Sequence, residues 1–461
     1  MSSTKATTSG SSSREPVSRR RFLGASAAAA AAPYIVPSTV FGATAPSNRV
    51  TVACIGGGNQ GFLDIRLFLK QADCQMVAVC DVNRGSQGYK NPDDVRGMEP
   101  AKSLVEEHYA KQSESGSYTG CDGYTDFRDV LARKDIDAVI IVTPDHWHDV
   151  MAVAAAKAGK DIYGEKPLGR TIAGQQAMVR AVRENNVVFQ TGSHERSNPY
   201  AKSACEFVRE GGIGKVRRVV CHVGRHNKIG PGPGWEPTPV PETLDYDMWL
   251  GPAPEAPYHK DRCFYNFRFI DDYAGGQTTN FGAHSIDLAQ WGLGTDLTGP
   301  TSVKHVFSEY LPEGSLFNAA TYLNFQCKYE SGVRLEVVTG HPSVRTTFYG
   351  DDGVVSVDNQ GQNATVIPRA MSPEMLLKRV KYHSGADHVR NFLDCVKTRS
   401  EPNAPIEVGH RSASICHLGN IAMSLRAELA WDPEAERFEG ERSGEATAML
   451  TRDQRPQWKV A

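Results

Sequence analysis

The sequence predicts an α/β protein whose N-terminal half contains a doubly wound parallel sheet. An apolar segment at 50–55 runs directly into a glycine-rich turn, as the first strand of a nucleotide-binding fold does. Helix-like segments separate it from four further apolar segments, at 75–80, 138–142, 161–164 and 187–191. Polar clusters follow the ends of these segments. Alternating strands and helices favour a parallel sheet, which binds ligands at the carboxyl ends of its strands.

Length and composition exclude several classes of protein. A chain of 461 residues is long enough for two or three domains, at roughly 100–200 residues per domain. It has 40% hydrophobic and 23% charged residues, so it is not a disordered chain. The formal net charge of −2 provides no basic field for nucleic acid. No apolar run approaches the roughly 20 residues of a membrane span.

Residues 1–42 differ in composition from the rest of the chain and resemble an export signal. Ser18, three arginines, Phe22 and Leu23 stand in sequence, and an alanine run at 25–32 follows them. This order of a twin arginine, a mildly apolar segment and small residues indicates a Tat signal, with a disordered basic tail as the alternative. Because Tat export moves folded proteins, often with a cofactor inserted, we expect a periplasmic protein that binds its cofactor before export.

The glycine-rich turn carries the clearest functional motif. It has the pattern G-x-G-x-x-G at Gly56, Gly58 and Gly61, with Asn59 and Gln60 between the last two glycines. The first glycine permits a tight turn, the second lets the backbone approach a pyrophosphate, and the third lets the helix pack closely on the strand. The N–H groups at the start of that helix would bind the phosphates. We therefore assign all five residues to a cofactor site.

Asp81 ends the second apolar segment, 20 residues past Gly61. A carboxylate at this place accepts hydrogen bonds from the adenosine ribose hydroxyls and repels the 2′-phosphate of NADP. Arg84, three residues later, could neutralise such a phosphate. The motif as a whole predicts NAD as the cofactor and favours it over NADP.

Further candidate residues follow the third and fourth apolar segments. Thr143, Pro144 and His148 come after the third, and Glu165 and Lys166 come after the fourth. Because the carboxyl ends of parallel strands meet at one edge of a sheet, we assign these five residues to the cofactor site. His148 is part of an H-x-H pair, but no third or fourth ligand lies near it in the sequence. No metal site is therefore predicted.

A second group of polar residues has helical spacing. Asn280, His284, Asp287 and Trp291 are separated by 4, 3 and 4 residues, so a helix would place all four on one stripe. A histidine on such a stripe is often a core residue with its hydrogen bonds satisfied. Here its neighbours on the stripe are polar or aromatic, which favours the wall of a polar pocket.

Five motifs spread along the chain carry a family resemblance. They are CIGGGNQG (54–61), VTPDHWH (142–148), YGEKPLG (163–169), GSHERS (192–197) and NFGAHSIDLAQWGLG (280–294). Together they resemble the Gfo/Idh/MocA oxidoreductase family, and in particular its exported members from planctomycete-type bacteria. The resemblance implies a Rossmann domain (43–191), then an α/β domain with a large, open, mostly antiparallel sheet (192–430), and a tail (431–461). It also implies homo-oligomers that form through the open sheet.

The same resemblance implies that Lys166 is catalytic. In this family the lysine of the E-K-P motif lies beside the nicotinamide and the reacting hydroxyl. A cation there lowers the pKa of the hydroxyl and stabilises a developing alkoxide. Glu165 would bind the cofactor ribose or orient Lys166. The bond between Lys166 and Pro167 is expected to be cis on the same grounds.

The resemblance further implies that His284 is the general acid–base, which takes the hydroxyl proton as the hydride leaves. The family pattern is D-x-x-x-H, whereas this chain has Asn280 in the place of the aspartate. An asparagine can orient the imidazole but cannot stabilise an imidazolium by charge. We expect Asp287, three residues after His284, to provide the missing carboxylate.

Five other residues are weaker candidates for contacts with the substrate. His194 and Arg196 follow the fifth apolar segment, and a solvated loop is the alternative there. Trp249, Tyr265 and Arg268 lie in the long connection after it. They either face a sugar ring or only anchor that connection.

These expectations predict an NAD-dependent oxidoreductase that acts on the CH–OH group of a small carbohydrate, a sugar or polyol. Because the periplasm has no free NAD pool, the cofactor would be held tightly and reset within the site. One alternative is an NAD-dependent glycoside hydrolase, which oxidises a hydroxyl, eliminates the aglycone, adds water and returns the hydride. A second is a cofactor-binding protein without catalysis, which the presence of both Lys166 and His284 disfavours.

Overall fold

The computed structural model describes residues 48–460, apart from 227, 341–343, 359–363 and 368–385. The predicted export signal, 1–42, lies outside the described residues. Among the helices of the described part of the chain, none is both long enough and apolar enough to cross a membrane.

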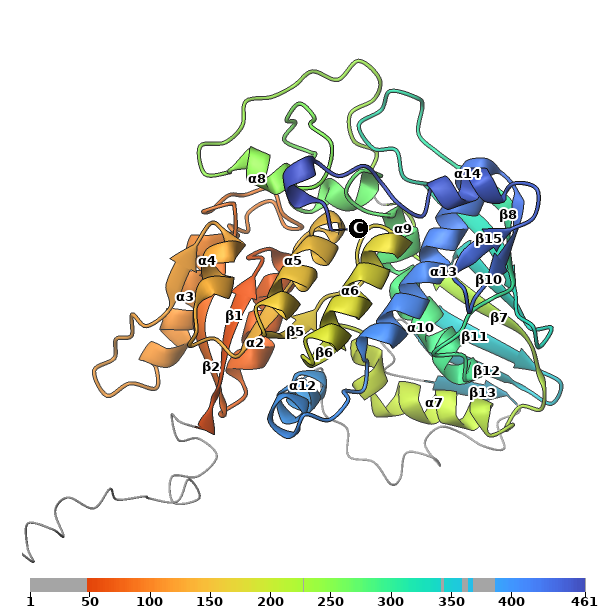
Figure 1. Cartoon of the computed structure of the whole chain (residues 1–461), viewed down its shortest axis with the longest axis horizontal. Coiled ribbons are helices and arrows are strands. Elements are labelled where there is room, and N and C mark those ends of the chain that lie inside the picture. Colours follow the sequence, from red (N-terminus) through yellow and green to blue (C-terminus); the bar gives the residue numbers. More distant parts are fainter. Residues whose placement is uncertain (1–47, 227, 341–343, 359–363, 368–385, 461) are drawn as a thin grey trace, which may run out of the picture. The chain divides into compact units, whose positions relative to one another are not determined.

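The N-terminal part is built on a six-stranded sheet in the order β3-β2-β1-β4-β5-β6, with all strands parallel (Figure 1). The strands are β1 (Val50–Ile55), β2 (Cys74–Cys80), β3 (Asp122–Tyr124), β4 (Ala138–Ile141), β5 (Asp161–Gly164) and β6 (Phe189–Thr191). The helices around them are α2 (Asn59–Leu69), α3 (Met98–Ala110), α4 (Phe127–Ala132), α5 (Asp145–Lys157) and α6 (Ile172–Glu184). The strand order reverses between β1 and β4, which confirms the predicted doubly wound fold.

This sheet is covered on both faces because its central strands are apolar throughout. Val52 and Cys54 of β1 pack with Phe68 of α2 in one core, whereas Ala53 and Ile55 belong to a second core on the α5 side. Full burial of an Ile or Val side chain contributes about 1.5–3 kcal/mol. A continuous apolar segment is therefore stable only where helices cover both faces of the strand.

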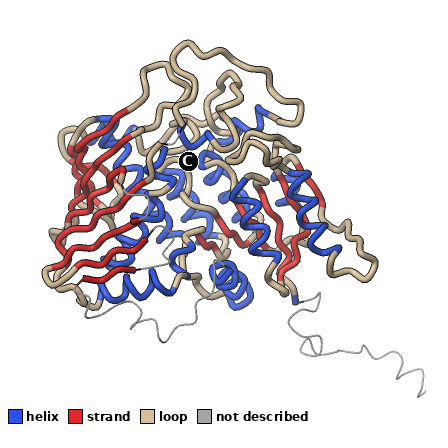
Figure 2. The backbone as a smooth tube through the Cα atoms, turned by 180° about the vertical axis from the view of Figure 1, so that it is seen from behind, coloured by secondary structure: helices blue, strands red, loops and turns tan. Residues whose placement is uncertain are grey.

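The C-terminal part has a nine-stranded sheet in the order β13-β12-β11-β7-β10-β9-β8-β14-β15. Its strands are the red segments on the left of Figure 2. Its strands are β7 (Val216–Val223), β8 (Ser302–Glu309), β9 (Tyr322–Lys328), β10 (Arg334–Thr339), β11 (Val344–Gly350), β12 (Val354–Asp358), β13 (Ala364–Ile367), β14 (Glu428–Asp432) and β15 (Arg437–Glu439). All pairs of neighbouring strands are antiparallel except β7 and β10. The mostly antiparallel sheet that the family resemblance implies is confirmed.

Helices cover one face of the second sheet (Figure 1). They are α7 (Pro199–Arg209), α10 (Gly282–Leu293) and α13 (Ile406–Leu425), with α14 (Ser443–Ala448) beside β15. Ile286 of α10 and Phe325 and Phe348 of the sheet are fully buried in the shared core. The helix α12 (Ala386–Thr398) packs instead against α2 of the first domain.

The segment 431–461 is not a separate tail, so that expectation is wrong. Trp431 and Phe438 face each other across β14 and β15, and both are buried in the core of the second sheet. Trp458 packs on Trp147 of α5, with ring centroids 4.8 Å apart. The segment is held in place because it buries Trp431 and Phe438 and partly buries Trp458, and aromatic side chains contribute a large apolar surface.

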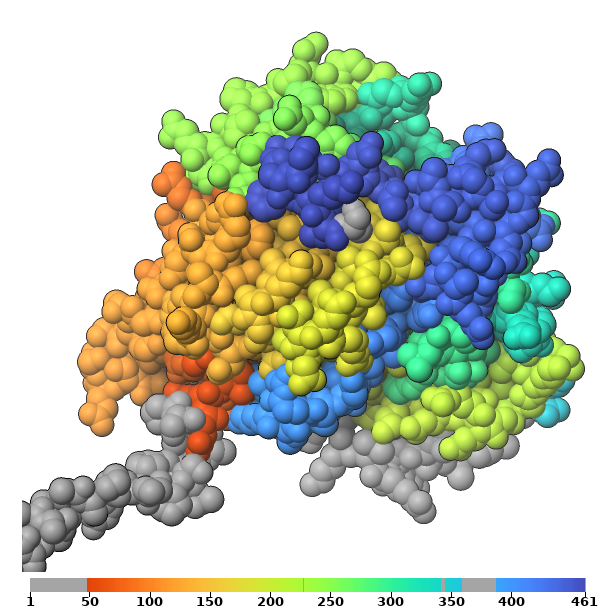
Figure 3. Space-filling view, in the orientation of Figure 1, coloured from red at the N-terminus to blue at the C-terminus, as the bar shows by residue number. Residues whose placement is uncertain are grey.

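Short helices gather at the edge of the first sheet where its strands end. They are η3 (His194–Ser197), α8 (Tyr246–Leu250), η4 (Asn266–Phe269), α9 (Gly276–Asn280) and η5 (Pro456–Trp458). The long connection that contains α8 and η4 has its own core around Phe269 and Tyr273. The C-terminal segment lies against this connection (Figure 3), where Arg455 binds the carboxylate of Asp247 at 2.5 Å. The carboxyl end of the sheet is thereby closed on one side.

Candidate active site

The glycine turn between β1 and α2 has the shape of a phosphate cradle. Gly56 has a φ of +117°, which glycine adopts readily, and a Cβ atom at Gly56 or Gly61 would collide with neighbouring backbone. Gly58, Asn59 and Gln60 line a cavity, and α2 begins at Asn59. The N–H groups and the positive end of the helix dipole are thus available at that cavity. The turn fits the pyrophosphate of a dinucleotide.

Asp81 lies at the same cavity, at the end of β2. One carboxylate oxygen accepts from the Gly57 N–H at 2.6 Å and the other from the Asn83 N–H at 2.8 Å. Burial raises the pKa of Asp81 to about 6, although both of these hydrogen bonds lower it. The carboxylate keeps lone pairs for ribose hydroxyls, so it fits NAD. Arg84, the residue considered above for a 2′-phosphate, donates to the carbonyl of Glu242 at 3.3 Å.

A cavity of about 240 Å³ extends from the glycine turn to the ends of β4 and β5. It brings together most of the predicted cofactor residues: Gly56, Gly58, Asn59, Gln60, Asp81, Thr143, Pro144, Glu165 and Lys166. Three of the predicted substrate residues, Trp249, Tyr265 and Arg268, line the same cavity. The ring of Tyr265 lies 4.2 Å from the guanidinium carbon of Arg268. The roles of these three toward a substrate remain predictions.

His148 does not reach this cavity, so its assignment as a cofactor residue is wrong. The side chain is buried, and its Nδ1 lies 2.7 Å from the carbonyl oxygen of Pro167. Its Nε2 lies 2.8 Å from the carbonyl oxygen of Thr143. The imidazole therefore links the loops after β4 and β5, and positions the residues that line the cavity.

Lys166 leaves the end of β5 and lies at the far end of the cavity. Its Nζ donates to the carbonyl oxygen of Asn280 at 3.1 Å and lies 3.5 Å from Asn280 Oδ1. Burial lowers the pKa of Lys166, which Glu165 partly offsets. The carboxylate of Glu165 accepts from the Lys166 N–H at 3.2 Å, and burial raises its pKa. The Lys166–Pro167 bond is cis, as the resemblance implies.

Asn280 does not orient His284, contrary to the expectation from their spacing. Its Oδ1 accepts from Arg268 at 3.1 Å, and its Nδ2 donates to Gln277 Oε1 at 2.9 Å. The physical reason is a break in the helix: α9 ends at Asn280 and α10 begins at Gly282. The two side chains are therefore not on one continuous stripe, and Asn280 instead supports Lys166.

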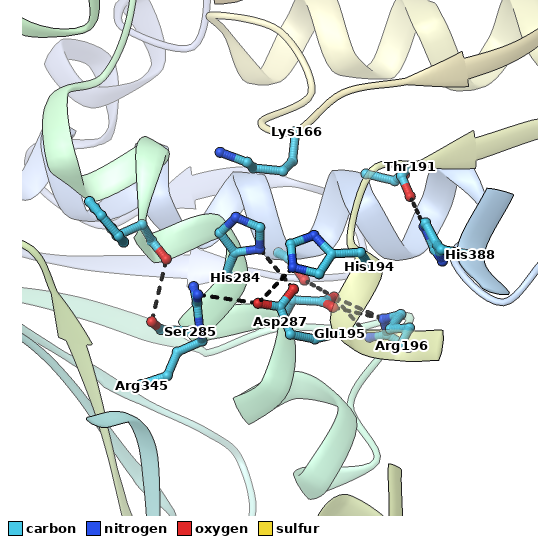
Figure 4. A network of polar contacts seen from close by, with 12 residues as sticks. Lys166, Thr191, His194, Glu195, Arg196, His284, Ser285, Asp287, Arg345 and His388 are labelled. Carbon is cyan, nitrogen blue, oxygen red and sulfur yellow. Dashed lines mark hydrogen bonds and ion pairs between the residues drawn. The ribbon is translucent and has the colours of Figure 1, made fainter. Parts of the chain in front are cut away.

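Glu195, a residue that the sequence reasoning missed, is the partner of His284. His284 Nδ1 lies 2.9 Å from Glu195 Oε2, and Glu195 is 1% exposed (Figure 4). Burial would raise the pKa of Glu195, but its contacts with His194, His284 and Arg345 lower it well below its usual range. Burial lowers the pKa of His284 to about 3, so the imidazole is neutral beside an ionised carboxylate. The sequence offered one signal for this role, since Glu195 follows the fifth predicted strand and stands next to a histidine.

Asp287 faces away from His284 and forms an ion pair with Arg196, which corrects both assignments. Arg196 Nε lies 2.9 Å from an Asp287 oxygen, and both side chains are almost fully buried. Arg196 also binds Asp296 at 2.7 Å, and Ser412 donates to Asp287 at 2.9 Å. These contacts engage both oxygens of Asp287 and the Nε and Nη2 of Arg196. We therefore assign Asp287 and Arg196 to the structural framework that connects η3, α10 and α13.

Ligand-type atoms of His194, Glu195 and His284 lie within 4.8 Å of one another. Metal sites in proteins have such groupings. Here Arg345 lies 3.3 Å from Glu195 Oε1 and already neutralises the carboxylate. We therefore interpret the grouping as a polar unit of two imidazoles and one carboxylate, in which His284 is hydrogen-bonded to Glu195 and His194 lies 3.5 Å from it.

Comparison with known families identifies both halves of the chain. Residues 50–193 match the NAD-binding Rossmann fold of the oxidoreductase family GFO_IDH_MocA. Residues 228–460 match the C-terminal alpha/beta domain of the same family, GFO_IDH_MocA_C2. The second match alone spans half of the chain.

Individual relatives are more distant. The chain is 36% identical over 116 residues to levoglucosan dehydrogenase of Pseudarthrobacter phenanthrenivorans, a match that covers 25% of this chain and 30% of that enzyme. It is 25% identical over 285 residues to scyllo-inositol 2-dehydrogenase (NAD(+)) of Bacillus subtilis, covering 59% of this chain and 71% of the relative. The first of these matches thus spans less than a third of the relative.

Solved structures share the fold at low identity. Levoglucosan dehydrogenase in complex with NADH and levoglucosan superimposes with a TM-score of 0.59 at 18% identity, covering 83% of this chain and 99% of the other. The WlbA dehydrogenase of Bordetella pertussis, in complex with NADH and UDP-GlcNAcA, superimposes with a TM-score of 0.60 at 17% identity. The match covers 83% of this chain and 99% of the other. The cradle, the carboxylate of Asp81 and the two matched domains agree that NAD is the cofactor and that the chain belongs to the Gfo/Idh/MocA oxidoreductase family.

Proposed function

We propose that the protein moves a hydride between a secondary alcohol carbon of a sugar or polyol and a tightly held NAD. The observation that carries the proposal is the position of Lys166, whose ammonium lies at the end of the cofactor cavity beside Asn280. His284 is near enough for the charge of Lys166 to lower its pKa. The names of two relatives, levoglucosan dehydrogenase and scyllo-inositol 2-dehydrogenase, support this substrate class.

The protein residues would manage the proton of the reacting hydroxyl. When bound, NAD would accept the hydride and could return it. The ammonium of Lys166 would stabilise a developing alkoxide electrostatically. Because the Glu195 carboxylate accepts from His284 Nδ1, the lone pair of this neutral imidazole is on Nε2. Figure 4 shows this nitrogen on the side of Lys166, where it can take the hydroxyl proton.

Two contacts close over the cofactor cavity, and together we call them the cofactor cover. They join the segment that contains Asn83 and Tyr89 to the segment that contains Leu244 and Phe264. Asn83 and Leu244 form an isolated β-bridge, and Tyr89 stacks on Phe264 with ring centroids 4.7 Å apart. Tyr89 and Phe264 both line the cofactor cavity, and Tyr89 lies directly against Gly58 of the phosphate cradle. Release of a dinucleotide would require these contacts to open.

Removing the aromatic pair, by Tyr89→Ala together with Phe264→Ala, should speed NAD release. An aromatic pair contributes about 0.5–1.5 kcal/mol beyond its buried area, so release should be about tenfold faster. Gel filtration followed by quantification of the retained nucleotide measures this. Tyr349→Ala, at a half-exposed position on the second sheet, is the control and should retain NAD. If the wild type, the double variant and the control retained NAD equally, the proposed role of the cover would be refuted.

The proposed reaction can be tested on the protein with its bound NAD. A panel of levoglucosan, inositols and methyl glycosides is added, and the absorbance of the reduced nicotinamide is followed. Reduction by at least one member is expected. If no member reduces the cofactor and no keto sugar re-oxidises it, the proposal is wrong.

Hydrolysis by transient oxidation is the second candidate, and the second imidazole on Glu195 favours it, because elimination needs one more base than oxidation does. Two relatives support it by name. They are 2,7-anhydro-N-acetylneuraminate hydratase of Mediterraneibacter gnavus, 32% identical over 187 residues, and Glycosyl hydrolase family 109 protein 1 of a Shewanella species, 32% over 153 residues. Release of reducing sugar from a glycoside without accumulation of NADH would distinguish it from net oxidation.

Export through the Tat system, with NAD already bound, is also part of this proposal. It rests on Arg19 and Arg20 and on the alanine run that follows them. Fractionation of cells that express the full chain should place the NAD-loaded protein in the periplasm. Retention in the cytoplasm would contradict it.

A further inference from the structure

Two imidazoles share one carboxylate in this site. Glu195 Oε2 lies 2.9 Å from His284 Nδ1, and Glu195 Oε1 lies 3.5 Å from His194 Nε2. The centroids of the two imidazole rings are 5.2 Å apart. Figure 4 shows both rings on the same side of Glu195, with their other nitrogens turned toward Lys166. Hydride transfer from an alcohol needs one proton acceptor, so the second imidazole is left without a role in that step.

The Glu195 carboxylate determines which nitrogen of His284 carries the proton, and it sets the orientation of both rings. An ionised carboxylate only accepts hydrogen bonds, and Arg345 at 3.3 Å favours the ionised form. The hydrogen bond to Glu195 therefore places the proton of His284 on Nδ1 and its lone pair on Nε2. His194 turns its Nε2 toward the carboxylate, so that its Nδ1 lies with His284 Nε2 on the side of Lys166. The site thus presents two oriented bases to one space.

The two bases differ in their surroundings. His284 is 8% exposed and lies in the first turn of α10, whereas the side chain of His194 is 44% exposed and belongs to the short helix η3. A histidine in a solvated loop has no need of a buried carboxylate as a partner, whereas His194 lies 3.5 Å from Glu195, which is 1% exposed. Burying Glu195 costs free energy unless its oxygens are paired, so the contacts to both rings and to Arg345 hold the unit together.

We propose that His194 is a second general base, which removes a proton from the carbon next to the carbonyl formed by oxidation. This inference rests on the proposed function, because only the carbonyl makes that C–H bond acidic. The electron pair of the C–H bond moves into an enolate, whose oxygen is stabilised by the ammonium of Lys166. The proton is held on His194 Nδ1, and no oxidant or reductant is needed.

The enolate has two fates, which define the substrate class. Return of the proton from His194 restores the ketone. If the next carbon bears an ether or glycosidic oxygen, its C–O bond breaks instead, the enolate becomes an enone, and His194 gives its proton to the departing oxygen. The unit of His194, Glu195 and His284 therefore fits sugars with a leaving group in the β position to the oxidised carbon.

Exchange of deuterium from solvent tests His194 separately from hydride transfer. The NAD-loaded protein is incubated in D₂O with scyllo-inositol and with methyl glycosides, and the recovered alcohol is analysed by mass spectrometry and NMR. The wild type should incorporate deuterium only at carbons next to the oxidised one. His194→Gln should lower the ratio of deuterium incorporation to nicotinamide reduction by about 10²-fold. His284→Gln should lose both signals, whereas His108→Gln, on α3, should lose neither.

Three other results would overturn the inference. One is that His194→Gln incorporates as much deuterium as the wild type. Another is that the wild type oxidises and reduces its nicotinamide but incorporates no deuterium. A stoichiometric bound metal, measured by elemental analysis, would mean that the rings are ligands rather than bases. Long-range ¹H–¹⁵N spectra add a test without substrate, since His194 must be protonated at Nε2 and not at Nδ1. Failure of every probe to reduce the nicotinamide would instead refute the proposed function, and this inference with it.

Discussion

Lys166→Met is expected to slow hydride transfer by about 10³-fold and to leave NAD bound. Methionine keeps the length and most of the apolar contacts of the lysine, but it removes the ammonium that lies 3.1 Å from the Asn280 carbonyl oxygen. The phosphate cradle and Asp81 are at the other end of the cavity, so the affinity for NAD should change little. The loss should therefore appear in the rate of the chemical step.

Single-turnover kinetics with the best substrate of the panel would measure this loss, and the retained nucleotide would measure binding. Lys157→Met, at an exposed position in the last turn of α5, is the matched control and should behave as the wild type. A loss smaller than about tenfold would exclude Lys166 from stabilising the reacting oxygen, because a group that acts only in the transition state costs more than that.

Asp287→Ala is expected to destabilise the protein by about 3–5 kcal/mol, because it removes one partner of a buried ion pair. Arg196 is 6% exposed and would keep only Asp296, which is itself partly exposed. Replacing both partners with apolar residues, as Arg196→Met with Asp287→Leu, should recover much of this loss. The destabilisation does not depend on His284, whose carboxylate partner is Glu195.

Urea unfolding of the NAD-loaded variants would compare their free energies of unfolding at one NAD concentration. Asp351→Ala breaks an exposed pair with Arg217 and is the control; it should lose little, because solvent screens that pair. If Asp287→Ala lowered turnover but left stability unchanged, the role of Asp287 would be catalytic, as its spacing from His284 first indicated.

The nucleotide-binding half could be predicted well because its signals are local. The strand before Gly56, the turn itself and the helix after it are contiguous, and each residue's role follows from the backbone geometry of that turn. Asp81 and Lys166 were found for a related reason: each directly follows an apolar strand, and parallel strands bring their ends together. Of the cofactor residues predicted in this way, His148 is the one that the structure contradicts.

The wall opposite the cofactor was predicted less well because helical spacing assumes an unbroken helix. The break at Phe281 separates Asn280 from His284, and Asn280 turns to Lys166 and Arg268 instead. Asp287 lies on α10 with His284 but faces η3 and α13, where Arg196 and Ser412 bind it. The spacing thus placed His284 on the correct helix, but it predicted the wrong contacts for Asn280 and Asp287.

The sequence by itself determined the fold class, the cofactor and the two residues proposed to handle the substrate hydroxyl, Lys166 and His284. These depend on patterns of a few consecutive residues, whose geometry is set by the backbone. The tertiary structure decided how the proton chemistry is arranged. Glu195 and His284 are 89 positions apart, and only the packing of η3 against α10 places a carboxylate between two imidazoles. Such contacts arise from the packing of elements that are far apart in the sequence, which no local pattern encodes.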